Sequence, residues 1–480
     1  MNEEMKKLNE LADGWIREHK EELIEEIRGM VRIPSVSKEW EAEENAPFGP
    51  ECRRMIDYFL ERGRAFGFQT RDAHGYAGVI SWGNPEEQIG IISHLDVVPV
   101  GDGWVYPPFE ATYLPEEDAL IGRGVDDDKG PAVMGLYLMR MLRDLEIPMK
   151  HGIALYGGTS EETGMEDMAQ LVKLGEKFPK LSLIPDAGFP VNYAQKGNLN
   201  VWLKAPAAGN LKDFRAGSAF NIIPDYAEAI VDLPLAEAKS AIETLPEELK
   251  KTIDISEAEG GVRIAANGVS GHAAFPDGSV NAVGLLSEVL TKAGILTGSA
   301  KDAVAGLAVL TEDAYLLSEK ADYSDEESRK TTLVYSMVKL EDGFLKVAGD
   351  SRYSISYDGE VLKEKLAKAW NGLGYEIESI KDYPPFYIPK DDPRVTTLQE
   401  IYKEVTGRGE EPYAMGGGTY SRVVPNAISF GNGMPGSRHP DFLPEGHGGA
   451  HGRDEVLFLD NLMESMKIYF ISLIMLDKII

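Results

Sequence analysis

The spacing of apolar positions predicts a long amphipathic helix near the start of the chain, followed by alternating strands and helices. Residues 4–31 place apolar side chains at helical intervals. Short apolar runs typical of buried strands follow at 89–93, 152–156 and 181–184. A helical pattern begins near Pro131, between the first two of these runs. Strand–helix–strand order at this spacing predicts an α/β sheet with parallel strands.

A change of pattern in the middle of the chain predicts a second domain inserted into the first. From about Asn192 to about Pro385, strand-like alternation is mixed with an acidic helical pattern at 233–251 and an acidic loop at 323–329. After Pro385 the α/β pattern returns. We therefore predict a catalytic domain whose mixed, largely parallel sheet is flanked by helices, with a large inserted α+β lid domain. The predicted boundaries are 1–192 and 386–480 for the discontinuous catalytic domain and 193–385 for the lid.

Charge and composition narrow the classes of function. The 480 residues include 49 Lys and Arg against 79 Asp and Glu, a net charge of −30. Such an acidic surface repels phosphate and anionic lipid, so we expect neither a nucleic-acid nor a membrane partner.

The apolar segment 454–480 is predicted to be a buried helix, because its longest uncharged stretch, 468–476, falls short of the roughly 20 residues that span a bilayer. The single cysteine, Cys52, and an N-terminus without an apolar signal core predict a cytoplasmic protein.

Acidic and histidine residues follow each of the three predicted strands. His94 and Asp96 come after the first strand, Glu161 and Glu162 after the second, and Asp186 after the third. Ligands bind beyond the carboxyl ends of strands in open α/β sheets, so we expect these side chains to converge. Each group alone has an ordinary explanation, such as a hydrogen-bonded core histidine or a solvated turn. Their joint placement favours a functional site.

Two further groups of residues are candidates for the same site. Asp126, Asp127 and Asp128 precede the helix that begins near Pro131. Acids at a helix start also interact favourably with the helix dipole, so helix capping explains this run equally well. His451 lies in a glycine-rich stretch before Asp454 and Glu455 and carries little information alone.

The chemistry of amide hydrolysis accounts for these residue types. The reaction needs a nucleophile, an electrophile for the carbonyl oxygen and a proton donor for the leaving amine; two metal ions can supply the first two. Imidazole and carboxylate ligands suit zinc, manganese or cobalt. One carboxylate must bridge the ions, and one unligated acid must act as base. An adjacent pair such as Glu161 and Glu162 fits, with one residue on a metal and the other facing the water.

Six motifs of this chain resemble those of one enzyme family. SHLDVVP, GRGVDDDKG, GGTSEETG, PDAGFP, NGVSGHAAFPDG and GGAHGRDE occur in this order. The same series is found in the co-catalytic metallopeptidases, a family that includes carboxypeptidase G, aminoacylase, succinyl-diaminopimelate desuccinylase and carnosinase. The resemblance runs from about Ile33 to Glu455. Within the family the chain is most similar to the bacterial dipeptidase V type, because of its large insert, its PDAGFP stretch and GGGTYSR at 416–422.

The resemblance implies two divalent metal ions per chain, with zinc the first expectation and manganese or cobalt the alternatives. His94 and Asp186 would hold one ion, and Glu162 and His451 the other. Asp127 would bridge them, because the family's bridging acid is the first residue of Asp-x-Lys-Gly. The peptide bond after that residue is expected to be cis.

The resemblance also implies roles for residues that do not bind metal. Glu161 would be the general base, and Asp96 would orient the imidazole of the neighbouring ligand. In the lid, His272 would polarise the substrate carbonyl, while Asn221 and Arg352 would hold the substrate. An arginine can clamp a carboxylate with two hydrogen bonds, which suits the C-terminus of a dipeptide. The backbone amides expected to share that task are those of Gly417, Gly418 and Thr419.

Some positions depart from the family pattern. Asp126 stands where relatives usually have a neutral residue, and Ser354 stands where many have proline after the arginine motif. His439 and His447 lie near His451 and compete with it as the last ligand. His451 is preferred because Ala-His-x-x-Asp-Glu matches the family's form.

These observations predict a metal-dependent dipeptidase that hydrolyses small peptides with a free N-terminus. An N-acyl-amino-acid deacylase or desuccinylase of the same family would share the metal site and is the main alternative. A non-catalytic metal-binding protein is a remote alternative, disfavoured by the presence of Glu161. The lid is nearly 200 residues long, about twice what a small dimerising domain needs, so we expect a monomer whose lid covers its own active site.

Overall fold

The computed structural model describes residues 3–480, which divide into two compact units. Unit 1 comprises the chain up to Tyr193 together with Ile388–Tyr413 and Thr419–Ile480, and unit 2 comprises Ala194–Tyr387 and Ala414–Gly418. The sequence prediction had assigned 414–418 to the catalytic domain. In the structure these residues bond within unit 2, where the N–H of Lys196 donates to the Met415 carbonyl at 3.0 Å.

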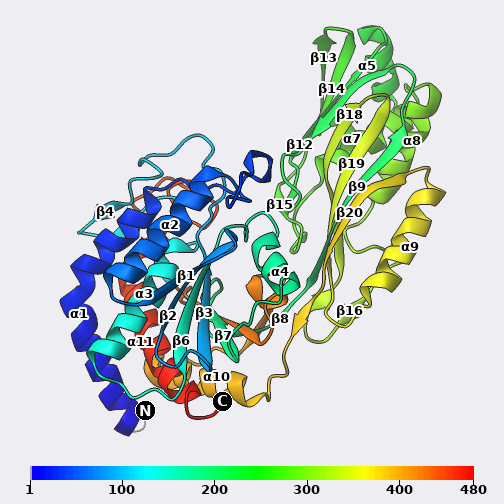
Figure 1. The fold of residues 1–480 in the computed structure, drawn as a ribbon. Coiled ribbons are helices and arrows are strands. Elements are labelled where there is room, and N and C mark those ends of the chain that lie inside the picture. Colours follow the sequence, from blue (N-terminus) through cyan, green and yellow to red (C-terminus); the bar gives the residue numbers. More distant parts are fainter. Residues whose placement is uncertain (1–2) are drawn as a thin grey trace. The chain divides into compact units, whose positions relative to one another are not determined.

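Unit 1 is built on a mixed sheet (Figure 1). Its strands are β1 (Gln69–Ala73), β2 (Ala77–Trp82), β3 (Gln88–His94), β6 (Gly152–Gly158), β7 (Leu181–Ile184), β8 (Val191–Gln195) and β23 (Ala427–Phe430), in the order β1-β2-β6-β3-β7-β23-β8. The central strands β6, β3, β7 and β23 are parallel, and β1, β2 and β8 pair antiparallel at the edges. The short strands β21 (Phe386–Tyr387) and β22 (Tyr413–Met415) also pair with β8. The predicted strands at 89–93, 152–156 and 181–184 are therefore confirmed as β3, β6 and β7.

Helices cover both faces of this sheet. They are α1 (Glu3–Val31), α2 (Pro50–Ala65), α3 (Lys129–Asp144), α4 (Glu166–Lys173), α10 (Pro393–Thr406) and α11 (Leu459–Leu476), with 3₁₀ turns η1 (Glu39–Glu41) and η2 (Tyr420–Arg422). Helices α2 and α3 pack directly on the sheet, and α1 and α11 pack on α3. Helix α4 clusters with Ala154 and Tyr156, whereas α3 meets the alternate residue Leu155 of the same strand. Because alternate side chains of a strand point to opposite faces, α4 covers the other side. The predicted fold class, a sheet flanked by helices, is confirmed.

The two terminal helices differ in how well their limits were predicted. The N-terminal helix, expected at 4–31, is confirmed as α1. The C-terminal helix begins at Leu459 and not at Asp454, because the residues just before it form β24 (Val456–Phe458). That strand pairs with β5 (Ala119–Ile121), which pairs in turn with β4 (Thr112–Leu114). In the described part of the chain, no helix combines the length and apolar content needed to cross a membrane.

The single cysteine lies in the core of unit 1. Cys52, on α2, is buried, and its Sγ donates to the Ser35 carbonyl at 3.6 Å. Burial, followed by the negative charge of nearby Asp96, raises the pKa of the thiol far above its ordinary value.

Unit 2 is built on an eight-stranded antiparallel sheet (Figure 1). Its strands, in spatial order, are β13 (Ile253–Ala258), β14 (Gly261–Asn267), β12 (Tyr226–Val231), β10 (Leu211–Ala216), β18 (Thr332–Glu341), β19 (Phe344–Tyr353), β9 (Gly197–Pro206) and β20 (Glu376–Tyr383). The helices are α5 (Leu235–Glu243), α6 (Glu247–Lys250), α7 (Ala282–Ala293), α8 (Gly298–Leu310) and α9 (Gly359–Gly372). Alternate side chains of β9, including Leu199, Val201 and Leu203, are buried in one core with side chains of α7 and α8. The alternation expected for a half-covered strand is therefore present.

Two segments of unit 2 are divided more finely in the structure than the sequence predicts. The helical pattern at 233–251 forms two helices, α5 and α6, because Pro246 lacks the N–H that a continuous helix would need there. The acidic loop at 323–329 contains one strand of a small antiparallel pair and ends at the first residue of the other; these strands are β16 (Ser324–Asp325) and β17 (Arg329–Lys330). The carboxylate of Asp325 organises this turn by accepting the N–H of Ser328 at 2.6 Å.

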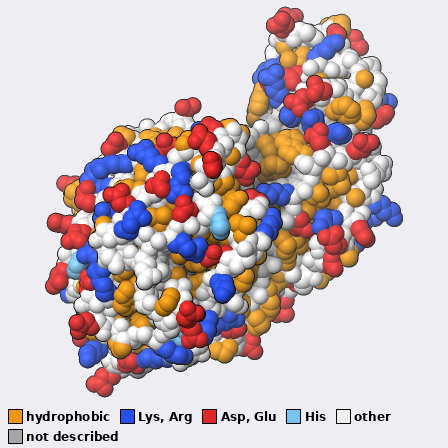
Figure 2. Space-filling view, viewed as in Figure 1, with side chains coloured by type: hydrophobic (Ala, Val, Ile, Leu, Met, Phe, Trp, Pro, Cys, Tyr) orange, Lys and Arg blue, Asp and Glu red, His pale blue; other side chains and the backbone are white. Residues whose placement is uncertain are grey.

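Acidic and basic side chains are intermixed on the face of the molecule that Figure 2 shows. On the face shown in Figure 2, Asp and Glu side chains are scattered over both units and intermixed with Lys and Arg. The net charge of −30 is therefore not gathered into one patch on that face.

Candidate functional site

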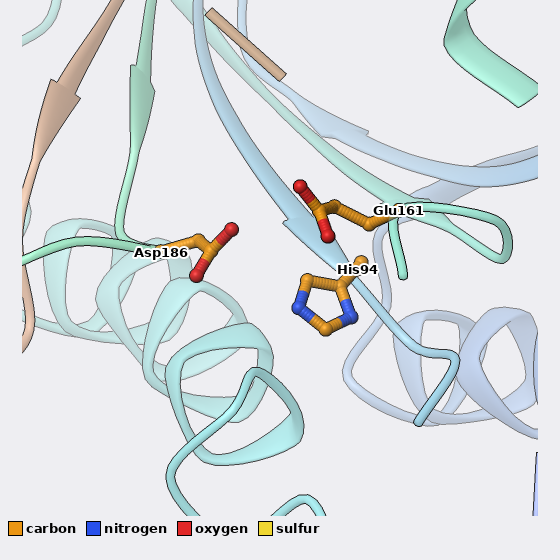
Figure 3. A group of neighbouring side chains, drawn as sticks. All are labelled: His94, Glu161 and Asp186. Atoms are coloured by element: carbon orange, nitrogen blue, oxygen red, sulfur yellow. The ribbon is translucent and has the colours of Figure 1, made fainter. Parts of the chain in front are cut away.

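The carboxyl ends of three adjacent parallel strands bring a histidine and two acids together. Strand β3 ends at His94; Glu161 follows β6 and Asp186 follows β7. Each of the three side chains offers one ligand atom, and these atoms lie within 4.8 Å of one another. Figure 3 shows the imidazole and the two carboxylates turned toward a common space. The convergence expected from the strand order is therefore present in the structure.

A second group shares the same histidine. Ligand atoms of His94, Asp127 and Glu162 also lie within 4.8 Å of one another. Asp127 Oδ1 is 2.9 Å from His94 Nε2, and Asp127 Oδ2 is 3.0 Å from His451 Nε2. The second imidazole also lies 3.0 Å from Glu162 Oε1. One carboxylate thus stands between two imidazoles with one oxygen facing each, which is the arrangement a bridging ligand requires.

The other candidates for the last ligand have different partners. His447 Nδ1 pairs with Asp454 Oδ2 at 2.5 Å, and His439 Nδ1 pairs with Asp441 Oδ1 at 3.2 Å. Of the three histidines, the structure brings only His451 to the carboxylates of the cluster. Its side chain is 53% exposed, so this ligand position opens toward solvent.

The three consecutive acids before α3 have three different environments. Asp128 is the N-cap of α3, but its side chain makes no capping bond; it accepts the N–H of His94 at 3.1 Å instead. Asp126 accepts from the Asn432 side chain at 3.1 Å. Only Asp127 contacts both imidazoles, and the peptide bond between it and Asp128 is cis. Helix capping therefore does not account for these acids.

Asp96 contacts the site through two different groups. His94 Nδ1 lies 3.0 Å from the Asp96 carbonyl oxygen and 3.6 Å from its carboxylate. That carboxylate accepts the backbone N–H groups of Glu161 at 3.1 Å and Glu162 at 3.2 Å. Its stronger contacts therefore fix the turn that carries the two glutamates, in addition to its place beside the imidazole.

Burial and neighbouring charges shift the pKa values of this cluster in different directions. Burial, together with neighbouring carboxylates such as Asp186, raises the pKa of Glu161 well above its ordinary value. Burial opposes ionisation of Asp127 too, but the hydrogen bonds from His451 and His94 lower its pKa overall. Contacts with Asp127 and Glu162 raise the pKa of His451 to about 11. Asp127, which faces two imidazoles, is thus stabilised as an anion, whereas burial keeps the pKa of Glu162 raised although His451 faces it.

The donor set fits divalent cations. Four carboxylates and two imidazoles face one space, a combination suited to zinc, manganese or cobalt. Within the described residues, the buried Glu162 Oε1 accepts no hydrogen bond of good geometry. His451 Nε2 lies 3.0 Å from this oxygen but is not aligned to donate to it. Such an oxygen, among acids with raised pKa values, is suited to a metal ion, which supplies positive charge.

The remaining predicted residues lie mostly in unit 2, where their local contacts are clear. His272 lies on β15 (Gly271–His272), which pairs with β11 (Ile222–Ile223). Its Nδ1 accepts the N–H of Ala274 at 3.1 Å. The imidazole is therefore the tautomer with its proton on Nε2. Desolvation, followed by the positive charge of Arg352, lowers its pKa.

The guanidinium of Arg352 is held by its own unit. Its Nε and Nη2 donate to the two carboxylate oxygens of Asp350 at 2.7 and 2.9 Å. Its Nη1 donates to the Gly416 carbonyl at 3.0 Å. The buried Asp350 also accepts from the Asn198 side chain at 3.1 Å. The three bonds that Arg352 donates, two to Asp350 and one to Gly416, leave two of its five N–H groups for another ligand.

Other predicted substrate residues are less informative. The carbonyl of Asn221 accepts the N–H of Ala273 at 2.9 Å, next to β15. Gly417 and Gly418 belong to unit 2, whereas Thr419 belongs to unit 1. The Thr419 hydroxyl is buried and bonds to Ser429 Oγ at 2.7 Å. The backbone N–H of Ser354 donates to Thr331 Oγ1 at 3.0 Å, a bond that the proline found in many relatives could not make.

Sequence reasoning does not identify two residues that support the site, Asp167 and Glu455. Asp167 accepts the N–H groups of Thr159 at 2.6 Å and Ser160 at 3.0 Å, and the Tyr420 hydroxyl at 2.6 Å, so it shapes the turn before Glu161. Glu455 accepts N–H groups from the loop that carries Asp127. Glu455 had one sequence signal, its place inside the GGAHGRDE motif. Nothing in the sequence singled out Asp167.

Comparisons with known proteins identify the family and the fold. A profile described as "Peptidase family M20/M25/M40" matches residues 90–473. A Bacillus subtilis (strain 168) protein named "Putative dipeptidase YtjP" is 30% identical over 463 residues, covering 94% of this chain and 96% of its own length. The fold is similar to human carnosine dipeptidase 1, with a TM-score of 0.60, 14% identity and coverage of 99% of each chain. It is also similar to the di-peptidase Dug1p from Saccharomyces cerevisiae, with a TM-score of 0.59, 13% identity and coverage of 100% of this chain and 99% of that one.

Proposed function

The chain belongs to peptidase family M20/M25/M40 and is a metallopeptidase, and from that premise we propose that it hydrolyses dipeptides with a free N-terminus at a two-metal site. The observation that carries the proposal is the position of Asp127, with one oxygen facing each of two imidazoles. His94 and Asp186 would hold one ion, and Glu162 and His451 the other, with zinc the first choice and manganese or cobalt the alternatives. Bound ions would polarise the scissile carbonyl and acidify a water molecule.

Glu161 is the proposed general base. Its backbone is fixed by the Asp96 carboxylate, and its side chain lies beside the ligand atoms of His94 and Asp186. In the reaction the Glu161 carboxylate accepts the proton of the attacking water and then delivers it to the leaving amine. A carboxylate near the cations but bonded to neither is suited to both transfers.

His272 is the proposed donor to the substrate carbonyl. Its Nδ1 is occupied by the Ala274 N–H, so Nε2 carries the proton that the imidazole can offer. Its lowered pKa favours the neutral ring at physiological pH. A neutral N–H donor stabilises the developing oxyanion without adding a positive charge next to the metal ions.

Arg352 is the proposed clamp for the substrate's C-terminal carboxylate. Asp350 and the Gly416 carbonyl fix the guanidinium and leave two N–H groups for a ligand. Asn221 and the backbone amides of Gly417, Gly418 and Thr419 would hold the rest of the main chain. Recognition of that carboxylate so near the reacting carbonyl would restrict the enzyme to short peptides. The names of the relatives, which include dipeptidases of bacteria, yeast and human, support this substrate class.

We also propose that the enzyme acts as a monomer in the cytoplasm. Both edge strands of the lid sheet carry charged side chains, with Asp254 and Glu257 on β13 and Glu376 and Lys381 on β20. Charged edges discourage pairing with a second sheet, so a monomer is favoured over a dimer formed through the edges of this sheet. A buried single thiol suits a reducing compartment.

A substrate panel tests the proposal. The purified enzyme, with added zinc, manganese or cobalt, is given unmodified dipeptides, tripeptides and N-acylated amino acids, and the released amines are measured. We expect turnover of dipeptides in preference to the other two classes, and its loss after chelation. Preference for N-acylated amino acids would show that the enzyme is a deacylase, the alternative that shares this metal site.

A further inference from the structure

A buried ion pair joins the loops that carry Asp127 and His451. Arg123 Nη1 lies 2.7 Å from Glu455 Oε2, and both side chains are only 1% exposed. The two residues are 332 positions apart in the chain. A buried ion pair contributes little to stability by itself, because the cost of desolvating two charges offsets their attraction. The location of this pair therefore needs another explanation.

The second oxygen of Glu455 holds the first loop. Glu455 Oε1 accepts three backbone N–H groups, from Gly124 at 3.0 Å, Asp126 at 3.0 Å and Asp127 at 3.1 Å. One of these is the N–H of the proposed bridging residue itself. The main chain of that residue is therefore fixed directly by Glu455.

The second nitrogen of Arg123 holds the other loop. Arg123 Nη2 donates to the carbonyl of His451 at 3.1 Å and to that of Gly452 at 2.9 Å. The Trp104 ring covers the guanidinium, with its centroid 5.1 Å from the central carbon. Trp104 is in turn fixed by a 2.7 Å bond from its indole N–H to the Val100 carbonyl. The pair therefore links the backbone of Asp127 to the backbone of His451.

We propose that Arg123 and Glu455 are positioning residues that hold Asp127 and His451 at the separation one metal ion needs. This inference rests on the proposed two-metal function. Of the other proposed ligands, His94 ends β3 and Asp186 follows β7, and within the described residues no hydrogen bond joins either to the pair. The pair therefore supports the ion held by Glu162 and His451 more than the ion held by His94 and Asp186.

Metal titration of Glu455→Gln tests the proposal. The metal-free protein is titrated with Co²⁺, followed by visible absorption, and with Zn²⁺, followed by calorimetry. The wild type is expected to bind two equivalents. In the variant, one equivalent should bind within about threefold of the wild-type affinity and the other about 10–100-fold more weakly, the usual effect of losing a residue that supports a metal ligand. Excess metal should restore most of the activity, because the catalytic groups remain.

Glu26→Gln is the matched control. Glu26 is also buried and accepts from Arg62 at 2.7 and 3.0 Å, in a pair that joins α1 to α2. The charge removed is the same, so a general loss of stability would appear in both variants. Neither metal affinity should change in the control.

The double variant Arg123→Gln/Glu455→Gln covers the case in which a single substitution prevents folding. It leaves neither partner of this pair as an unpaired buried charge, and its melting temperature without metal shows whether it folds. As in Glu455→Gln, one of the two metal equivalents is expected to bind more weakly than in the wild type. Wild-type binding of both equivalents, or equal weakening of both, in the folded variants would overturn the positioning role. A wild type that binds fewer than two equivalents would instead overturn the two-metal function.

Discussion

The two units present their functional side chains in different ways. In unit 1 the parallel strands β6, β3 and β7 all end at one edge of the sheet, so the topology alone gathers His94, Glu161 and Asp186. The sheet of unit 2 is antiparallel and has no shared carboxyl edge. There His272 is presented by a two-residue strand, and Arg352 by the bonds that Asp350 and Gly416 make to it. The proposed metal ligands are thus positioned by the core of a domain, and the proposed substrate-binding groups by local contacts.

Of the variants compared, Asp127→Ala should cause the largest loss of metal and activity. It removes the carboxylate that faces both His94 and His451 in unit 1. Two dications a few ångströms apart repel strongly when no carboxylate lies between them, so both metal ions and activity should be lost. Elemental analysis after gel filtration measures the metal content. Asp57→Ala, at an exposed position on α2, should keep two ions. Two tightly held ions in Asp127→Ala would mean that Asp126 or Asp128 is the bridge.

Glu161→Gln should separate catalysis from metal binding in the same cluster. The variant loses the proton acceptor but no proposed metal ligand, so kcat should fall by about 10²–10⁴-fold while two ions remain. Steady-state kinetics and metal analysis on one preparation provide the measurement. Glu166→Gln, in the first turn of α4, is the control and should behave as wild type. Loss of metal together with activity would identify Glu161 as a ligand.

His272→Ala tests whether a residue of unit 2 takes part in the chemistry. Removal of an oxyanion donor should lower kcat by about 10²–10³-fold and leave the metal content unchanged. His439→Ala, at an exposed site in unit 1, should have no such effect. An unchanged kcat in His272→Ala would exclude the proposed role of the lid histidine.

Mixing two variants asks whether the lid acts on its own chain. Equal amounts of His272→Ala and Glu161→Gln are combined and assayed. If each monomer is complete, the mixture stays as inactive as its components, since neither chain can supply the group that the other lacks. Recovery of activity would show that His272 acts on a partner subunit, and the monomer proposal would be wrong.

Arg352→Lys should have the smallest effect. Lysine keeps the charge but loses the fork that bonds to Asp350 and to a substrate carboxylate. One charge-assisted hydrogen bond is worth about 1.5–3 kcal/mol, so KM should rise by about 10–100-fold with kcat within a few-fold of wild type. Arg263→Lys, which disturbs a similar pair with Glu228 elsewhere in unit 2, is the control. An equal fall in kcat would indicate a role in the reaction and not in binding.

The sequence predicted the parts of the fold that have a regular period. Strands β3, β6 and β7 and helix α1 are within a few residues of their predicted limits because their apolar positions repeat at strand or helix spacing. The helical pattern at 233–251 is confirmed as helical, but apolar spacing alone does not predict the break before Pro246, which lacks the N–H of a continuous helix. The start of α11 was misplaced because the apolar residues of β24 run directly into the helix.

The candidate site was predictable as far as its residues stand at strand ends or in motifs. His94, Asp127, Glu162 and Asp186 were named on those grounds, and the structure brings them together with His451. Their individual roles remain predictions. Glu455 and Asp167 could not be assigned, because what they do is accept backbone N–H groups from residues far away in the sequence or in a turn. Such contacts depend on the path of the main chain, which cannot be predicted from the type of the accepting residue.

The buried thiol of Cys52 has a practical consequence. It is 1% exposed and its pKa is raised by burial, so thiol-reactive dyes should leave the native protein unlabelled. A cysteine introduced at an exposed position in each unit, such as Lys6 on α1 and Glu248 on α6, would then be the only reactive pair. Energy transfer between two dyes at these positions would report the distance between the units as substrate and metal are added. The wild-type sequence thus already provides the unreactive background that single-molecule experiments usually require engineering to obtain.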